Sequence, residues 1–160
     1  MNKEIRKDNS LNKTMTKLKA DKAFIPCPLD DGDELFPNGI FKFNITKMHE
    51  YIQKNIDTFV PEEVEINSFY VTHKYDDSQL ESVDISKPII IAEISPGRYN
   101  VIDGNHRVVK ARRQEKKYLM AYRLGVSQHL KFLTSKKAYL SFIEYWNGKV
   151  LDLSGKKSRS

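Results

Sequence analysis

The sequence predicts an α+β fold, a small mixed sheet with a β-hairpin and packed helices. Two β-branched runs, residues 88–94 and 98–102, flank Ser95-Pro96-Gly97, and strands joined by such turn residues form a hairpin. A further strand-like run, Tyr118–Leu124, follows a helix-compatible stretch. Strands and helices do not alternate regularly, which favours α+β over a parallel doubly wound sheet.

The length of 160 residues, or 18.6 kDa, suits one domain. Residues 1–20 are polar and Lys-rich and predict a flexible basic arm, and residues 151–160 predict a similar tail. Between them there is no Gly/Ser-rich linker and no internal repeat. We therefore expect a single folded body over residues 21–150.

The first part of this body, residues 23–43, is rich in proline, glycine and acidic residues. It predicts either a long ordered loop or a pair of short strands around Asn38-Gly39. A helix should follow, because Asn44 is a favourable N-cap. Apolar residues then recur at helical spacing, namely Ile45, Met48, Ile52 and Ile56.

The middle of the chain contains three further expected elements. Apolar residues alternate with polar ones over residues 64–71, which predicts a strand. Residues 77–83 suit one or two helical turns. No helix-breaking residue interrupts residues 105–117, so we expect a helix there.

The last helix is predicted by apolar residues at positions i, i+3, i+4 and i+7, which are Tyr139, Phe142, Ile143 and Trp146. Ser135 or Thr134 would cap its start. Asn147-Gly148 would end it, since Asn and Gly favour the left-handed conformation that closes helices.

Charge is distributed unevenly along the chain, whose total is +6. Residues 61–103 carry a net −6, whereas residues 104–160 carry a net +11 from 14 Lys/Arg and three Asp/Glu. A strongly basic segment attracts phosphate groups, whether of a nucleotide or of a nucleic acid. The basic C-terminal third therefore predicts nucleic acid as one alternative partner.

Composition also bears on the compartment. No apolar run approaches the roughly 20 residues of a membrane span, and no apolar stretch follows the basic N-terminal residues as in a secretory signal. The single cysteine, Cys27, cannot form an internal disulfide. We expect a cytoplasmic protein without a membrane partner.

The junction between the second hairpin strand and the next helix carries the strongest functional signal. Gly104 permits a sharp turn, and the first amides of a helix lack internal partners and attract anions. Arg107 can hold phosphate oxygens through two parallel hydrogen bonds. Candidate phosphate-binding residues are Gly104, Asn105, His106, Arg107 and Lys110. A solvated basic helix after a glycine turn would give the same pattern.

Candidate catalytic residues at this junction are Asp103 and His106, which could accept or carry a proton. Asp103 could also bind a metal ion, together with Asp31 and Asp33 of an acidic cluster, because Mg²⁺ prefers a few carboxylates plus phosphate oxygens. The same cluster is typical of a solvated turn. The histidines show no spacing for a zinc site, and His49 is expected on a helix surface.

The segment DGNHRVVKA, preceded by PIIIAEISPGRYNVI and followed by YLMAYRL, resembles the ParB/sulfiredoxin-like superfamily, which has a signature Gly-X-X-Arg turn after a strand. The resemblance covers roughly residues 64–124. It implies that Gly104 and Arg107 bind the phosphates of a nucleotide (ATP, ADP or CTP), as in the ParB N-terminal-like nucleotide-binding domain. It also implies Mg²⁺-dependent hydrolysis of a nucleoside triphosphate or phosphoryl transfer.

Two departures from that family shape the expected function. Sulfiredoxins carry their catalytic cysteine where this chain has Asn105, so we do not expect sulfinic-acid reduction. Only 36 residues follow Leu124, fewer than the DNA-binding and dimerisation domains of ParB partition proteins need. The expectation is a nucleotide-binding domain acting as an NTPase or small-molecule kinase. The alternative is a nucleic-acid-binding accessory protein of a plasmid or mobile element, without catalysis.

Overall fold

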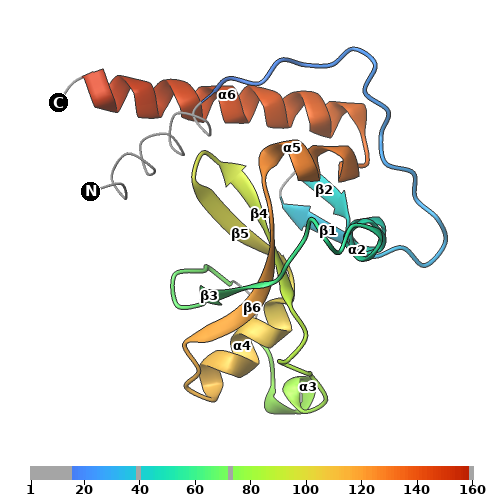
Figure 1. Cartoon of the computed structure of the whole chain (residues 1–160), viewed down its shortest axis with the longest axis vertical. Helices are drawn as coiled ribbons and strands as arrows, with labels where there is room; N and C mark the ends of the chain where they lie inside the picture. The colour runs from blue at the N-terminus through green and yellow to red at the C-terminus, as the bar shows by residue number, and fades with distance from the viewer. Residues whose placement is uncertain (1–15, 39–40, 72–73, 159–160) are drawn as a thin grey trace.

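A computed structural model describes residues 16–38, 41–71 and 74–158. The elements in chain order are β1 (Leu35–Asn38), β2 (Phe41–Asn44), α2 (Ile45–Lys54), β3 (Glu62–Glu65), α3 (Asp77–Leu80), β4 (Ile89–Ser95), β5 (Arg98–Asp103), α4 (Asn105–Arg113), β6 (Tyr118–Leu124), α5 (Val126–His129), a 3₁₀ turn (Leu130–Phe132) and α6 (Lys136–Ser158). Figure 1 shows α6 at one end of the molecule and α3 and α4 at the other. The α+β class is confirmed.

The main sheet has four strands in the order β3-β6-β4-β5. Strands β4 and β5 form the predicted antiparallel hairpin, with Gly97 at a φ of +75° in its turn. Strand β6 runs parallel to β4 and antiparallel to β3. Strands β1 and β2 pair in a separate antiparallel sheet, so the strand-pair alternative for residues 23–43 is confirmed. Gly39 of the predicted turn lies outside the described residues.

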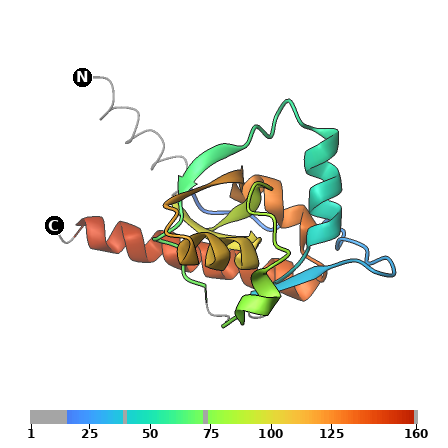
Figure 2. The ribbon, with the colours of Figure 1, turned by 90° about the horizontal axis from the view of Figure 1, so that it is seen from below.

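Strand β4 is buried along its whole length because both faces of the sheet are covered. Side chains of a strand point alternately to its two faces. Ile90 and Ala92 pack in a cluster with α2 and α6, whereas Ile89 and Ile91 pack in a second cluster with α4. The sheet therefore separates α4 from α2 and α6, and in the view from below α4 lies in front of α6 (Figure 2).

Helix α2 confirms the predicted cap and most of the predicted apolar face. The Asn44 side chain accepts a 3.0 Å hydrogen bond from the Lys47 amide, and Ile45, Met48 and Ile52 are buried. The prediction for Ile56 is wrong, because the helix ends at Lys54 and leaves Ile56 57% exposed.

The strand predicted over residues 64–71 is also wrong beyond its first residues, since β3 ends at Glu65. The Ile66 amide still bonds to the Lys117 carbonyl, and the chain then turns at Phe69. The Arg112 guanidinium on α4 donates to the carbonyls of Ile66 and Phe69. This contact takes backbone groups that a longer strand would need.

Helix α4 stops at Arg113, several residues before the predicted end near residue 117. Glu115 adopts a φ of +59°, and the Lys116 amide bonds back to the Ala111 carbonyl at 2.9 Å. This is the hydrogen-bond pattern of a helix that closes on a left-handed residue. That residue is usually glycine, and because glutamate stands here, local preferences do not predict this helix end.

Helix α6 confirms the four predicted apolar residues as buried, and Ser135 supplies the cap through a 3.0 Å bond from the Ala138 amide. The predicted end at Asn147-Gly148 is wrong, because the helix continues to Ser158 through most of the segment assigned to the tail. The Asn147 side chain instead bonds the backbone of Leu18, at 2.7 and 2.9 Å. The end of the predicted arm therefore contacts α6, while residues 1–15 lie outside the described residues.

Because α6 continues past Gly148, replacing this glycine with alanine should stabilise the protein. Gly148 is exposed, and a Cβ added to it meets nothing within 4 Å. Because alanine favours a helix interior over glycine by about 0.8–1 kcal/mol, Gly148→Ala should raise the free energy of unfolding by up to about that amount. Chemical denaturation monitored by circular dichroism measures this. A lowered stability would instead indicate that the helix closes at Gly148.

In the described part of the chain, no helix is both long enough and apolar enough to cross a membrane.

Candidate functional site

The junction between β5 and α4 has the backbone form that the sequence predicts. Gly104, with φ at +103°, directly precedes Asn105, the first residue of α4. The Val108 amide bonds to the Gly104 carbonyl at 3.0 Å. Within the described residues, the amides of Asn105, His106 and Arg107 have no acceptor. These amides and the helix dipole favour an anion at this end of α4.

A charged cluster stands next to these amides. The Asp103 carboxylate lies 2.7 Å from Nε2 of His49 and 3.5 Å from Nη2 of Arg107. The Asp103 side chain is only 13% exposed, whereas that of His49 is 38% exposed. Strand β5, helix α4 and helix α2 each supply one member, so the site joins two segments that are far apart in sequence.

The pKa of Asp103 reflects competition between burial and these two partners. Burial by itself raises the pKa of this carboxyl, but the hydrogen bond and charge of His49 and the charge of Arg107 outweigh burial. The pKa of Asp103 therefore lies below its ordinary value. The carboxylate is ionised at neutral pH and acts as an acceptor for its neighbours.

The Arg107 side chain is 18% exposed and already has one strong internal contact. Its Nη1 donates to the Pro88 carbonyl at 2.7 Å. A guanidinium carries five N–H donors, so the contacts with Pro88 and Asp103 do not use all of them. Arg107 thus orients Asp103 and retains donors at the edge of the junction.

The other two candidate residues on α4, His106 and Lys110, contact other parts of the chain. His106 is exposed, and its ring lies 4.1 Å from that of Tyr75 at an angle of 40°. The Lys110 ammonium group donates to the carbonyls of Val83 and Glu81, at 2.7 and 3.1 Å. Lys110 therefore bonds to the end of α3, away from the Asp103 cluster.

This use of Lys110 is part of a wider pattern on α4. Arg112 bonds the carbonyls of Ile66 and Phe69, and Arg113 bonds the Tyr75 carbonyl and the Asp77 carboxylate. Together with Lys110, these side chains hold the segment between β3 and β4 against the helix. Much of the charge that composition assigned to phosphate binding thus stabilises the fold.

The acidic cluster has a structural role at the start of α2. The Asp33 carboxylate accepts hydrogen bonds from the Asn44 side chain at 2.8 Å and from the Asp30 amide at 3.0 Å. The Asn44 hydrogen bond, followed by the backbone one, lowers the pKa of Asp33. Asp31 is exposed. Over the described ranges, no three His, Cys, Asp or Glu side chains gather as a metal site would need.

Two further features bear on the expected partners and chemistry. Burial raises the pKa of the Cys27 thiol, which disfavours the thiolate that a nucleophile needs.

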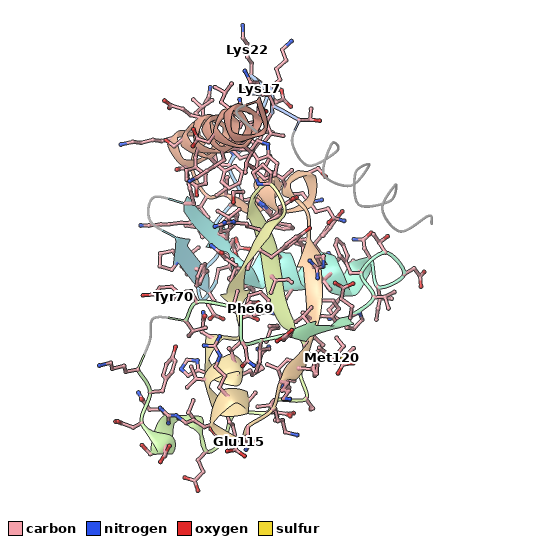
Figure 3. All side chains as sticks on the ribbon, turned by 90° about the vertical axis from the view of Figure 1, so that its left-hand side faces the viewer. Lys17, Lys22, Phe69, Tyr70, Glu115 and Met120 are labelled. Atoms are coloured by element: carbon pink, nitrogen blue, oxygen red, sulfur yellow. The ribbon has the colours of Figure 1, made fainter. Side chains whose placement is uncertain are left out.

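The lysines of the basic C-terminal third lie at both ends of the molecule. Lys116 and Lys117 follow α4, whereas Lys136 and Lys137 begin α6 at the other end (Figure 1). Figure 3 shows the two ends of the molecule from another side, with Lys17 and Lys22 near α6 and Glu115 at the opposite end. These lysines are spread out, and a nucleic-acid partner stays a prediction.

Sequence reasoning singled out Asp103, Gly104 and Arg107, and the structure brings them together. It did not identify His49, which lies 54 positions before Asp103. Nothing in the local sequence could have done so, because the contact depends on how α2 packs beside β5. Comparison with known proteins gave no matching family model and no similar curated protein or solved structure. The resemblance to the ParB/sulfiredoxin-like superfamily therefore stays a prediction.

Proposed function

We propose that this chain binds the phosphate groups of a nucleotide (ATP, ADP or CTP) at the β5–α4 junction. The observation that carries the proposal is the combination of three unpaired amides with an adjacent guanidinium. Amides at a helix start bind phosphate oxygens through hydrogen bonds and the helix dipole together. Arg107 would add charge-assisted bonds, which are about twice as strong as neutral ones.

The negative charge of Asp103 beside the phosphates needs compensation for such a site to work. The Arg107 guanidinium contacts its carboxylate, and its positive charge balances that of Asp103, so the pair carries no net negative charge. We leave Lys110 out of the proposed set, because its ammonium group is bonded to carbonyls at the end of α3. The proposed contacts are the amides of residues 105–107 and the Arg107 side chain.

The Mg²⁺ expectation stays a prediction, and the described side chains do not fit a dedicated site for it. Asp103 is bonded to His49, and Asp33 is bonded to Asn44 and the Asp30 amide. A Mg²⁺ ion would then be held mainly by the nucleotide's own phosphate oxygens and water, as Mg²⁺ commonly is. Nucleotide binding by residues 105–107 does not require the ion.

Replacing Arg107 with glutamine tests the proposal. The amide side chain can still donate a hydrogen bond, but it removes the charge that phosphate binding needs. Losing one charged hydrogen bond costs about 1.5–3 kcal/mol, so Arg107→Gln should weaken ATP, ADP or CTP binding about 10- to 100-fold. Isothermal titration calorimetry with each nucleotide, with and without Mg²⁺, measures this affinity.

Arg113→Gln is the matched control, because it removes the same charge from the same helix at an exposed position that pairs with Asp77. It should change nucleotide affinity by no more than about fivefold, since a screened surface charge contributes at most about 1 kcal/mol. Equal losses in both variants would reveal non-specific attraction to a basic helix. Wild-type protein that binds none of these nucleotides at millimolar levels would rule out the proposal.

A further inference from the structure

We propose that His49 is the general base of this site, activating water for attack on the terminal phosphate of a bound nucleoside triphosphate. This inference rests on the proposed nucleotide-binding function and assigns it a reaction. It begins from the pairing of His49 with Asp103, which crosses from α2 to the end of β5.

The pairing fixes which imidazole nitrogen can accept a proton. An ionised carboxylate only accepts hydrogen bonds, so Nε2 of His49 must carry the hydrogen that lies 2.7 Å from Asp103. In the neutral ring the lone pair is then on Nδ1. Within the described residues, the hydrogen bond from Nε2 to Asp103 is the only one that the His49 side chain makes, and this side chain is 38% exposed. Nδ1 is therefore available to water.

Asp103 is suited to orient this base. Its carboxylate is largely buried, Arg107 contacts it from the other side, and its pKa is below the ordinary value. A carboxylate that stays ionised favours the imidazolium that forms when His49 takes up a proton. Asp103 also directly precedes the glycine at the start of α4, so it holds the imidazole at the same junction as the unpaired amides.

The other described histidines lack this arrangement. His129 is fully buried between aromatic rings, and His106 is exposed against the ring of Tyr75. Neither side chain has a described hydrogen bond to a carboxylate. Only His49, among the histidines that the structure describes, combines an accessible nitrogen with a buried acid behind its ring.

The proposed step is hydrolysis of the bond between the terminal phosphorus and the bridging oxygen. The water oxygen forms a bond to the terminal phosphorus while Nδ1 of His49 takes the water proton. The bond between that phosphorus and the bridging oxygen breaks, and the electron pair leaves with the nucleoside diphosphate. Inorganic phosphate departs, and the imidazolium returns its proton to solvent. The amides of residues 105–107 and the Arg107 guanidinium stabilise charge on the phosphate oxygens.

The experiment separates binding from turnover in the full-length chain. Affinity for ATP and CTP is measured by calorimetry, and release of inorganic phosphate is measured with Mg²⁺ present. His49→Gln keeps an N–H donor for Asp103 but no base, so it should bind nucleotide within about threefold of wild type. Its turnover should fall about 10²- to 10⁴-fold, the usual contribution of a general base. Glu50→Gln is the matched control on the same helix and should not change turnover.

A second variant, His49→Ala, removes the ring and opens space for free imidazole. Added imidazole should raise the turnover of His49→Ala at least tenfold over that of the same variant without imidazole. A merely structural role for His49 would not produce this rescue. Unchanged turnover in His49→Gln, or lost turnover that imidazole does not restore, would overturn the inference. Wild-type protein that binds nucleotide but releases no phosphate would overturn it too, leaving the proposed binding function in place. Wild-type protein that binds no nucleotide would overturn both.

Discussion

Replacing Gly104 with alanine is expected to destabilise the fold by about 2–5 kcal/mol. The residue has a φ of +103°, and a Cβ there would lie 2.5 Å from Cγ2 and 2.9 Å from Cβ of Ile89. Left-handed backbone costs an L-residue about 1–2 kcal/mol, and overpacking a buried strand costs about 1–3 kcal/mol more. Ile89 is fully buried in β4 and has little room to move. Urea denaturation of both proteins measures the difference.

Replacing Gly97 with alanine is a matched control that measures the cost of the left-handed backbone alone. It also has a positive φ, +75°, but a Cβ added there meets nothing within 4 Å. Gly97→Ala should therefore cost only about 1–2 kcal/mol. Equal losses for the two variants would show that the Ile89 contact is unimportant. The same contact means that Gly104 is needed for packing between β4 and α4, whether or not a ligand binds nearby.

The second large effect concerns acid pH and His129. Its side chain is fully buried, with edge-on contacts to Phe43 and Phe142 at 5.3 Å each. Nε2 donates to the Glu93 carbonyl at 2.5 Å, while Nδ1 is buried without a partner. Burial lowers the pKa of His129 to about 4, despite the opposing effect of the Glu93 hydrogen bond.

This pKa makes stability depend on pH in a defined window. In the unfolded chain a histidine titrates near pH 6.5, so between about pH 6.5 and pH 4 the unfolded state binds more protons than the folded state. Stability should therefore be full above pH 6.5, fall as the pH drops towards 4, and change little further from this residue below 4. The loss amounts to about 3 kcal/mol.

His129→Gln should abolish that slope, because glutamine does not titrate yet can donate to the Glu93 carbonyl. Urea denaturation at intervals from pH 7 to pH 4 measures both proteins. The lowered pKa of Asp103 acts in a separate window, since a carboxyl whose folded pKa is depressed loses its contribution only below its ordinary value of about 4. Wild-type stability that is constant from pH 7 to pH 4.5 would contradict the expected burial of a neutral imidazole.

Elements with strong local signals were predicted most accurately. The hairpin has turn residues between two β-branched runs, and β6 has the predicted bounds, Tyr118–Leu124. The caps at Asn44 and Ser135 are side-chain bonds within three residues of the helix start. Such features depend on neighbours in the sequence, so the sequence is sufficient to find them.

Two predictions failed where distant contacts overrode a local preference. Asn147 bonds the Leu18 backbone and α6 continues, although Asn-Gly favours a helix end. The segment after Glu65 leaves the sheet because Arg112 binds its carbonyls. In both cases, a hydrogen bond joins groups more than 40 positions apart in the sequence at the place where the local preference failed.

Local sequence features were enough to predict the strand, the glycine and the helix start that place Asp103, Gly104 and Arg107 at one corner. The packing of distant elements brought His49 to this corner and led Lys110, Arg112 and Arg113 to bond the chain instead of an outside anion. These two kinds of interaction differ in their range along the chain. Turn and cap preferences act over a few residues, whereas the partner of a charged side chain depends on how α2, α3 and α4 pack around the sheet.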